Sequence, residues 1–426
     1  MRTKSVVCLR FGFFNYSYKA RVHMSIVEDS PILSPTFGRR MTSTYAVTTS
    51  VLIFAAASAP TPLYRLYEAS WGLSAFTVTV IFAAYAAGFL AALLTVASLS
   101  DFVGRKPVIF VSLLVNATVM YFSANAHDAR MLTFARVLQG IATGSAASTL
   151  GATIVDTTRS RGALFNSIIP VVGTATGALS SSVLVQYSLA PTRLVFLLFL
   201  AIFCVFAALD LVIDETAPRR PGALASLRPR VNVPTRVRSL FWSITPVNCA
   251  VWALGGFYLS LMPALVRLTT GSLSGLFVGI ATGTLTLSGA TAIIALHRFP
   301  PAKVFRTGTM ALILGVLVTL GGVALRSISL LVLGTVVAGA GFGTSYFGGL
   351  RTLLSRADAT DRAALLSAIY IQCYLAFSLP AVAVGSLLPL IGLPLATYLY
   401  GTALILLGTA SLVLTSSNRN ASATGN

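Results

Sequence analysis

Long uninterrupted apolar runs alternate with short polar segments along most of the chain. A helix needs about 20 mostly apolar residues to cross the hydrocarbon core of a bilayer, and each run is long enough. None of the runs alternates apolar and polar residues as a barrel strand does. The runs must therefore be helices, in which each segment satisfies its own backbone hydrogen bonds. The pattern predicts twelve transmembrane helices, over residues 45–63, 74–97, 107–125, 131–154, 163–186, 193–213, 243–264, 273–296, 307–325, 329–350, 363–388 and 393–415.

The composition does not suit a water-soluble globule. Of the 426 residues, 56% are apolar and 10% are charged, against roughly 25% charged in a typical soluble domain. The net charge of +19 could suggest nucleic acid, but a nucleic-acid module concentrates its basic residues on a soluble face beside aromatics. Here the charges lie between apolar runs. The composition therefore predicts an all-α membrane protein whose partner is the lipid bilayer, with no nucleic-acid partner.

The positive charges predict the orientation, because Lys and Arg are retained on the cytoplasmic side of short loops. With the amino terminus inside, 24 of the 30 Lys and Arg lie in cytoplasmic segments and 5 lie in outer loops. We therefore expect a multi-pass protein of the cell (cytoplasmic) membrane with both termini cytoplasmic. Residues 1–44 are expected to form a basic tail without a signal peptide, in which Met24 and Met41 are alternative starts.

The longest internal connection, residues 214–242, carries four prolines and six arginines. It predicts a cytoplasmic linker between two six-helix halves, residues 45–213 and 243–415, with a short cytoplasmic tail at 416–426. Three short matches recur between the halves at offsets of 202, 199 and 201 residues, one of them Gly140xxxGly144 with Gly339xxxGly343. A duplicated unit of about 200 residues is typical of transporter folds.

A charged turn, residues 97–107, follows the second predicted helix, and we call it the gating loop. It resembles the GxxxDxxGRK loop of the major facilitator superfamily, with Ala97 in place of the first glycine and Phe102 where an arginine is common. In that family the loop braces the two halves in the outward-facing state. The resemblance assigns this role to Asp101, Gly104, Arg105 and Lys106. The alternative is a solvated turn that only fixes the orientation.

An arginine lies inside the fourth predicted helix, in the segment Arg136-Val-Leu-Gln-Gly140. A central arginine costs roughly 2.5 to 3.5 kcal/mol to insert, so it should face protein or water. Gln139 and Thr143 share its helical face, which predicts a polar stripe along a cavity. The segment resembles the RxxQG motif of the same family. The alternative is an arginine near the outer end of its helix that extends to the interface.

The resemblance covers nearly the whole chain from about residue 45 and implies the family's fold, with the first, fourth, seventh and tenth helices around a central cavity. The substrate-cavity residues that it implies are Arg136, Gln139, Thr143, Asn248, Trp252, Tyr258 and Tyr346, with Tyr85 and Tyr374 from flanking helices. For each aromatic residue, ordinary helix packing is the alternative. Small residues four apart allow helices to approach closely, which predicts helix packing at Gly140, Gly144, Gly173 and Gly177.

The acidic residues limit the possible coupling mechanisms. None of the eleven lies at the middle of a predicted helix, whereas a proton relay usually needs a carboxylate in the cavity. Asp101, Asp156 and Glu68 remain as peripheral candidates, beside a substrate that carries its own proton and facilitated diffusion. A cavity with one cation should disfavour cationic substrates and accept neutral or anionic ones.

Together these features and the resemblance imply a secondary transporter that moves a small molecule by alternating access. No catalytic or metal-binding motif is found, so we expect no enzyme activity, no cofactor and no metal. Sparse polar lining and aromatic content favour an efflux antiporter for an amphiphilic compound. The alternative is an uptake symporter or facilitator for a polar or anionic solute such as a sugar or organic acid. Protons are a possible coupling partner, and a monomer is the default expectation.

Overall fold

The computed structural model describes residues 36–158, 161–229, 231–262, 264–265, 276–358 and 361–424, which belong to one compact unit, Leu33–Asn426. Most of the predicted amino-terminal tail lies outside the described residues, as does the start of the helix predicted from residue 273. Within the described ranges the chain forms helices and no strand. This confirms the predicted all-α class.

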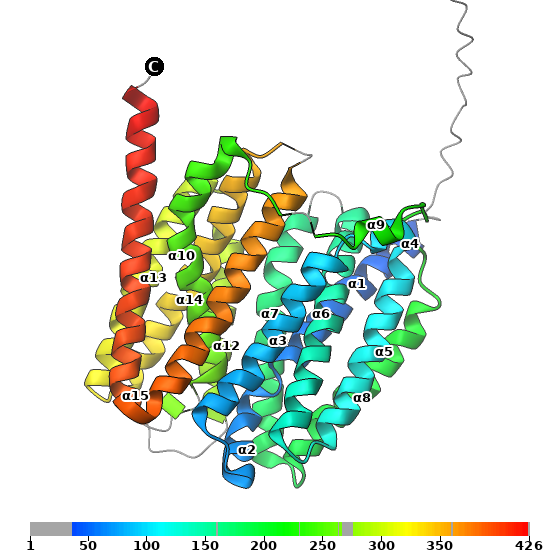
Figure 1. The fold of residues 1–426 in the computed structure, drawn as a ribbon, viewed down its shortest axis with the longest axis horizontal. Coiled ribbons are helices and arrows are strands. Elements are labelled where there is room, and N and C mark those ends of the chain that lie inside the picture. Colours follow the sequence, from blue (N-terminus) through cyan, green and yellow to red (C-terminus); the bar gives the residue numbers. More distant parts are fainter. Residues whose placement is uncertain are drawn as a thin grey trace, which may run out of the picture. The chain divides into compact units, whose positions relative to one another are not determined.

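The first group of helices lies on the right in Figure 1. It comprises α1 (Thr36–Ser58), η1 (Thr61–Leu63), α2 (Tyr64–Trp71), α3 (Ala75–Thr95), α4 (Ser100–Val103), α5 (Arg105–Ala124), α6 (Ala129–Thr158), α7 (Gly162–Tyr187) and α8 (Pro191–Asp210). The short helix α4 belongs to the gating loop and lies at the top of the view, while α2 lies at the bottom. We call these two ends of the bundle the gating-loop end and the η1 end.

The second group lies on the left in Figure 1 and follows a connection that contains α9 (Ala223–Ser226). It comprises α10 (Thr235–Ser260), α12 (Leu276–Leu296), α13 (Pro301–Ala324), α14 (Ile328–Leu354) and α15 (Arg362–Thr424). The long α15 is interrupted at Gly392, whose φ of 71° and ψ of 161° are not helical. It therefore contains two consecutive helices and covers both of the last two predicted spans.

Ten helices of the described chain are long and apolar enough to cross a membrane. One of them, Ala364–Ser417, has 54 residues and holds the two last predicted spans. The thirty-residue α6 is not among the ten, since it includes Arg136 and many small polar residues. The predicted count of twelve spans fits this arrangement and stays a prediction.

Many large apolar side chains point away from the protein interior. Phe134, Leu314 and Leu399 are 59%, 56% and 56% exposed. In water such a surface would drive association, but in a bilayer it contacts lipid tails at no cost. The distribution of apolar residues on the surface therefore agrees with a membrane-spanning bundle.

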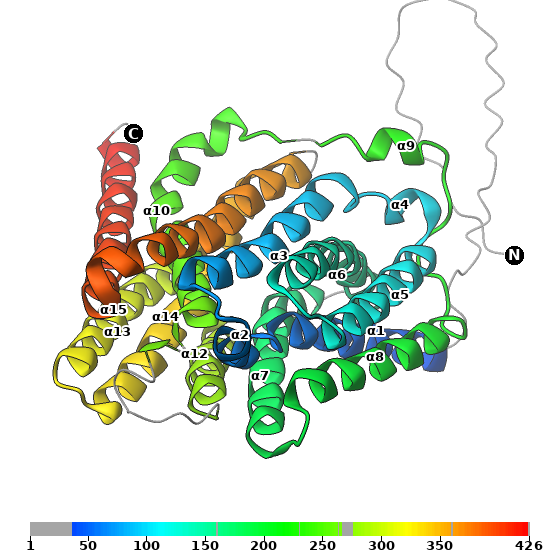
Figure 2. The same ribbon diagram turned by 60° about the horizontal axis from the view of Figure 1, so that its bottom comes forward.

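The two groups repeat the same helix pairings, and they meet where α3 lies beside α15 and α7 lies beside α12 (Figure 2). In the first group α3 packs on α6, α5 on α8 and α1 on α7, and in the second group α12 packs on α14, α13 on α15 and α10 on α15. These pairings agree with a duplicated six-helix unit. The helices also extend beyond the predicted boundaries, since α10 already begins at Thr235 and α15 continues to Thr424.

Local sequence signals explain several helix starts. Ser74 precedes α3 and its hydroxyl accepts the N–H of Thr77 at 3.1 Å. Ser327 does the same before α14, where its hydroxyl accepts the N–H of Leu330 at 3.4 Å. Serine at this position satisfies an N–H that has no partner inside the helix. These caps fix where α3 and α14 begin, and both helices contribute residues to the cavity described next.

Candidate functional site: a central cavity and its gating loop

A cavity of about 1400 Å³ lies between the two groups of helices. Its walls come from α1, α3, α6 and α7 on one side and from α10, α12, α14 and α15 on the other. At the gating-loop end it reaches the exposed Asp101 and Arg228, and towards the η1 end it stops at the buried Thr61, Arg136 and Tyr258. The cavity is therefore open towards the gating-loop end and closed towards the η1 end.

Two helix contacts between the groups close the η1 end. The rings of Phe82 on α3 and Phe377 on α15 lie 4.7 Å apart, and the rings of Phe89 and Tyr374 stack at the same distance. The second contact brings α12 against α7, where a Cβ added at Gly279 would come within 2.8 Å of Ala178 O. Aromatic pairing and close backbone approach therefore hold the two groups together here.

Arg136 lies at the closed end of the cavity, between α6 and α1. It is 3% exposed, and its Nη1 donates to Ala57 O at 3.0 Å and to Gln139 Oε1. Its guanidinium lies 4.4 Å from the centre of the Tyr85 ring, a cation–π contact that is stronger when desolvated. The Nε of Arg136 is buried and has no hydrogen-bond partner. The structure thus places the guanidinium inside the protein, with one free donor.

Three of the predicted cavity residues do not line the cavity in this conformation. Gln139 is 1% exposed and its Nε2 donates to Ala56 O at 3.1 Å. Thr143 is fully buried and donates to Asn116 Oδ1 at 3.3 Å. Asn248 donates to Gln372 Oε1 at 2.8 Å. These side chains satisfy polar groups between helices, since an unpaired one would be costly there.

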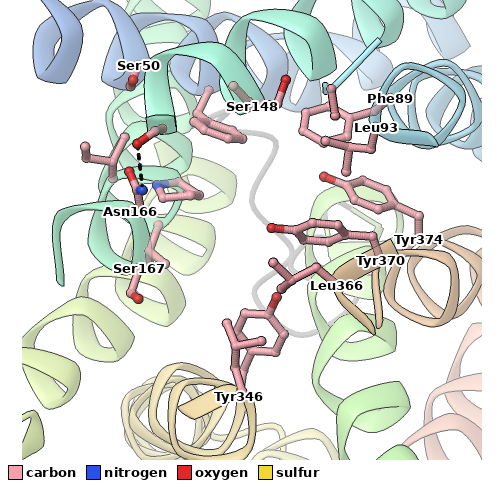
Figure 3. Close-up of a pocket in the computed structure, with 18 of the residues that line it drawn as sticks. Ser50, Phe89, Leu93, Ser148, Asn166, Ser167, Tyr346, Leu366, Tyr370 and Tyr374 are labelled. Atoms are coloured by element: carbon pink, nitrogen blue, oxygen red, sulfur yellow. Dashed lines mark hydrogen bonds between the residues drawn. The ribbon is translucent and has the colours of Figure 1, made fainter. Parts of the chain in front are cut away.

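Much of the wall from the second group is aromatic, and α3 of the first group adds further rings such as Phe89. Trp252, Tyr258, Tyr346 and Tyr374 all line the cavity. The Trp252 ring lies 5.0 Å from that of Tyr374 and 5.7 Å from that of Tyr346, and its buried indole N–H has no hydrogen-bond partner. Figure 3 shows Tyr346, Tyr370 and Tyr374 on one side of the cavity. This wall offers flat apolar surface with a free donor.

The facing wall carries hydroxyl and amide groups. Ser50, Ser148, Asn166 and Ser167 lie opposite the tyrosines in Figure 3. The Nδ2 of Asn166 donates to Gly151 O at 3.0 Å, and the residue lines the cavity. The sequence reading missed this wall, because isolated Ser and Asn residues in apolar helices give no signal of which face they occupy.

The gating loop brings its charges together at the open end. Gly104 has a φ of 97°, a conformation that glycine adopts without strain. The turn lets Arg105 Nη1 pair with Asp101 Oδ1 at 2.5 Å, and its Nε lies 3.5 Å from Asp156 Oδ2 at the end of α6. The side chain of Arg105 is 11% exposed. The predicted charged turn thus connects α4, α5 and α6.

Glu215, distant in sequence, caps the start of α5. Its carboxylate accepts the backbone N–H of Arg105 at 2.8 Å and that of Lys106 at 3.2 Å. An anion is favourable at a helix amino terminus, where N–H groups lack partners. The Nζ of Lys106 in turn donates to Leu211 O at 3.2 Å. The segment after α8 is thereby attached to the gating loop.

The whole architecture is that of a known family. A family model described as the Major Facilitator Superfamily matches residues 46–381. The chain belongs to this superfamily. Its members are membrane transporters, so the chain is a multi-pass membrane transporter of a small molecule rather than an enzyme. No individually curated protein matches the sequence significantly.

Solved structures of superfamily transporters have the same fold. A bacterial homologue of the human lysosomal transporter Spinster, inward-facing and occupied, has a TM-score of 0.70 and 13% identity over 90% of this chain and 98% of the other. The human organic anion transporter MFSD10 has a TM-score of 0.65 and 18% identity, over 89% of this chain and 100% of the other. A mutant of the nucleoside transporter NupG has a TM-score of 0.66 and 13% identity, over 88% of this chain and 99% of the other.

The four predicted packing glycines lie where helices of this superfamily fold approach closely. A Cβ on Gly140 would overlap Tyr85 O, and one on Gly177 would overlap Ala55 O. A Cβ on Gly144 would lie 2.8 Å from Phe89 O, and one on Gly173 would lie 2.6 Å from the Cβ of Phe54. These glycines pack α6 on α3 and α7 on α1, which forms the frame for the first wall.

No group of three or more His, Cys, Asp or Glu side chains that could hold a metal ion occurs in the part of the chain that the structure describes. The groups that line the cavity are aromatic faces, hydroxyl and amide groups, and the Arg136 guanidinium.

Proposed function

We propose that this transporter exports an amphiphilic, neutral or anionic small molecule across the cytoplasmic membrane by alternating access. The observation that carries the proposal is the cavity with one aromatic wall and one hydroxyl-bearing wall. A compound with a planar apolar body and a polar edge would fill both walls at once. Apolar contact would supply most of the affinity, and a few polar groups would set the orientation.

The charges along the cavity support a preference against cations. Among the described lining residues, Arg136 is the only charged one near the closed end. The other charged or titratable ones, Asp101, Asp156, Arg228, His297 and Arg351, lie near the gating-loop end. The free Nε of Arg136 can donate to an anionic or neutral acceptor, whereas the guanidinium would repel a cation.

The predicted orientation supports a cytoplasmic opening of the cavity. Loops rich in Lys and Arg are retained inside, and the gating-loop end carries Arg105 and Lys106. In this conformation a compound from the cytoplasm reaches the cavity directly. Rocking of the two halves would then open the η1 end, with the Arg105 contacts to Asp101 and Asp156 setting the balance between the two states.

Uptake of a polar or anionic solute is the second candidate, and the hydroxyl-bearing wall favours it. Ser148, Asn166 and Ser167 could bind the hydroxyl groups of a sugar or the carboxylate of an organic acid. The same inward-open conformation would then release the substrate. Export and uptake differ in the direction of net movement and not in this geometry, so a transport measurement must separate them.

Trp252 allows binding to be tested directly, because quenching of its fluorescence reports occupancy of the cavity. We would titrate the purified protein with three naphthalene probes of similar size that carry a sulfonate, a hydroxyl or a trimethylammonium group. We expect the sulfonate and hydroxyl probes to bind more tightly than the cation. Trp252→Phe should remove the response, whereas Trp242→Phe, at an exposed position (60%) outside the cavity, should retain it.

Arg136→Ala should weaken the sulfonate probe by about tenfold or more, the equivalent of one charge-assisted hydrogen bond, and leave the hydroxyl probe nearly unchanged. Tightest binding of the cationic probe would contradict the proposed substrate class. Accumulation of the probes in energised cells that lack their own pumps, with and without an uncoupler, tests direction. Lower accumulation that uncoupling abolishes supports export, and higher accumulation supports the second candidate.

A further inference from the structure

One buried carboxylic acid lies outside the cavity. Asp210 is the last residue of α8 and is 1% exposed, and among the acidic residues that the structure describes it alone is buried. Its Oδ1 is enclosed and has no hydrogen-bond partner. An ionised carboxylate in such a place loses its hydration without compensation, which is the costliest state for a buried group.

The hydroxyl group of one α1 residue lies beside this carboxyl group, and a second α1 hydroxyl lies beside the first. Tyr45 is 6% exposed and its hydroxyl lies beside Asp210 and Thr49. Thr49 is fully buried and its Oγ1 also has no hydrogen-bond partner. Two unpartnered oxygen atoms thus lie around one tyrosine hydroxyl, on helices that are distant in sequence. Unsatisfied buried polar atoms are rare, and a proton on the carboxyl group would give Asp210 a donor that it otherwise lacks.

The Tyr45 hydroxyl distinguishes the two protonation states of Asp210. It can donate its one proton to Phe206 O, 3.0 Å away, or to an ionised Asp210, but not to both. An ionised Asp210 would therefore compete with Phe206 O for that proton. A protonated Asp210 can donate to the Tyr45 oxygen and completes a chain from carboxyl group to phenol to carbonyl.

This carboxyl group also adjoins the start of the gating loop. The charged groups that act on it are Lys106 of α5 and Glu215 of the segment after α8. Lys106 donates to Leu211 O, directly after Asp210, and Glu215 caps α5. A negative charge on Asp210 would attract the Lys106 ammonium group and so displace the first turn of α5. Its protonation state therefore acts on the loop that controls the gate.

We propose that Asp210, with Tyr45 and Thr49, is a proton-binding site whose occupancy stabilises the conformation open at the gating-loop end. The carboxylate takes its proton from water at that end and returns it there when α5 moves and Lys106 turns towards the charge. This inference rests on the proposed alternating access, because it requires two states of different proton affinity. The sequence alone indicates Asp101, Asp156 and Glu68 as candidates for proton coupling. Asp210 is a further candidate that the folded structure reveals.

The test measures the conformation directly and needs no substrate. Spin labels would be attached to cysteines introduced at Arg161 and Ser355, which are exposed at the gating-loop end of the two halves. The native cysteines, Cys8, Cys204, Cys249 and Cys373, would be replaced by serine. The distance between the labels would be measured from about pH 5 to about pH 9, the range in which carboxyl groups with altered environments change charge.

We expect the long distance of the open state to dominate at low pH and the short distance to gain population as pH rises. Asp210→Asn should hold the long distance at every pH, since an amide donates to the Tyr45 oxygen as the acid does. The matched control, Asp361→Asn, removes a partly buried carboxylate at the same end and should keep the wild-type pH dependence.

Tyr45→Phe provides a second variant in case Asp210→Asn does not fold. Loss of the Tyr45 oxygen as acceptor should move the midpoint of the pH-dependent distance change to lower pH. The expected shift is roughly half to one pH unit, the equivalent of one hydrogen bond. A pH-independent wild type, or an Asp210→Asn variant with the wild-type pH dependence, would overturn the proposal. A shift caused by sodium in place of potassium at constant pH would identify a sodium site instead.

The outcomes separate this inference from the proposed function. Export of the naphthalene probes by a protein whose label distances ignore pH would refute the proton site and leave the transport proposal intact. Failure of every probe to bind, together with a pH-dependent distance that Asp210→Asn removes, would refute the substrate class and support the proton site.

Discussion

Gly279 offers a sharp test of how the η1 end is closed. It lies on α12 where that helix meets α7 of the other half. A Cβ at this position would overlap Ser182 Oγ and would lie 2.6 Å from Ser182 Cβ and 2.8 Å from Ala178 O. Gly279→Ala therefore inserts a methyl group between the two halves at the point where they must separate to open the η1 end.

The size of the conformational shift depends on which of the two conformations contains the overlap at residue 279. Overpacking of a closed contact costs about 1 to 3 kcal/mol. Alanine also favours a helix over glycine by roughly 1 kcal/mol, but that gain is the same in both conformations and cancels. The cost of the overlap falls only on the described conformation. The balance should therefore shift by roughly 5- to 150-fold towards the state that is closed at the gating-loop end.

The spin labels at Arg161 and Ser355 measure this shift as growth of the short-distance population in Gly279→Ala. Gly321→Ala is the matched control, because a Cβ there has no atom within 4 Å. It should gain the helix-forming benefit of alanine and leave the distances unchanged. Both variants should be compared at one pH, so that the protonation of acidic groups is constant.

A compensating change makes the reasoning refutable. Ser182→Gly removes the side chain that supplies two of the three close atoms, so the double variant Gly279→Ala with Ser182→Gly should recover most of the long-distance population. An unchanged distance in Gly279→Ala would show that the contact between α7 and α12 does not limit opening. A double variant as strongly shifted as the single one would show that the overlap is not the cause.

Other variants should change stability more than conformation. Gly140→Ala places a Cβ against Tyr85 O within one half, so we expect a lower melting temperature, from overpacking of about 1 to 3 kcal/mol, with unchanged label distances. Glu215→Gln replaces the charged cap of α5 by a neutral acceptor, which should cost about 1 kcal/mol in thermal unfolding. Tyr400→Phe removes a buried donor to Ala253 O at 2.7 Å, and a loss of roughly 1 to 3 kcal/mol should lower the melting temperature. A melting temperature equal to that of the wild type in any of the three would contradict the contact concerned.

The pattern of apolar residues was sufficient to predict the helices. In a bilayer each segment must satisfy its own backbone hydrogen bonds, so a long apolar run has one regular solution. The predicted runs at 74–97 and 107–125 correspond to α3 and α5. The charged turn between them was also readable, because Gly104 and its neighbouring charges act within a few residues of one another.

The side chains that face the cavity could not be predicted in the same way. Arg136, Gln139 and Thr143 share one face of α6, yet only Arg136 lines the cavity. The other two contact Ala56 and Asn116 on neighbouring helices. The helical period gives the direction of a side chain, but the distance to the next helix decides whether it meets space or another backbone.

Contacts between distant segments were decided by the tertiary structure alone. Glu215 caps a helix that begins 110 residues earlier, and Asp210 is enclosed by α1 and the start of α5. In the sequence both acids look like ordinary charges at a cytoplasmic helix end. Local periodicity determines the helices because their hydrogen bonds are local, whereas burial and partner choice depend on how the helices pack, which only the folded bundle specifies.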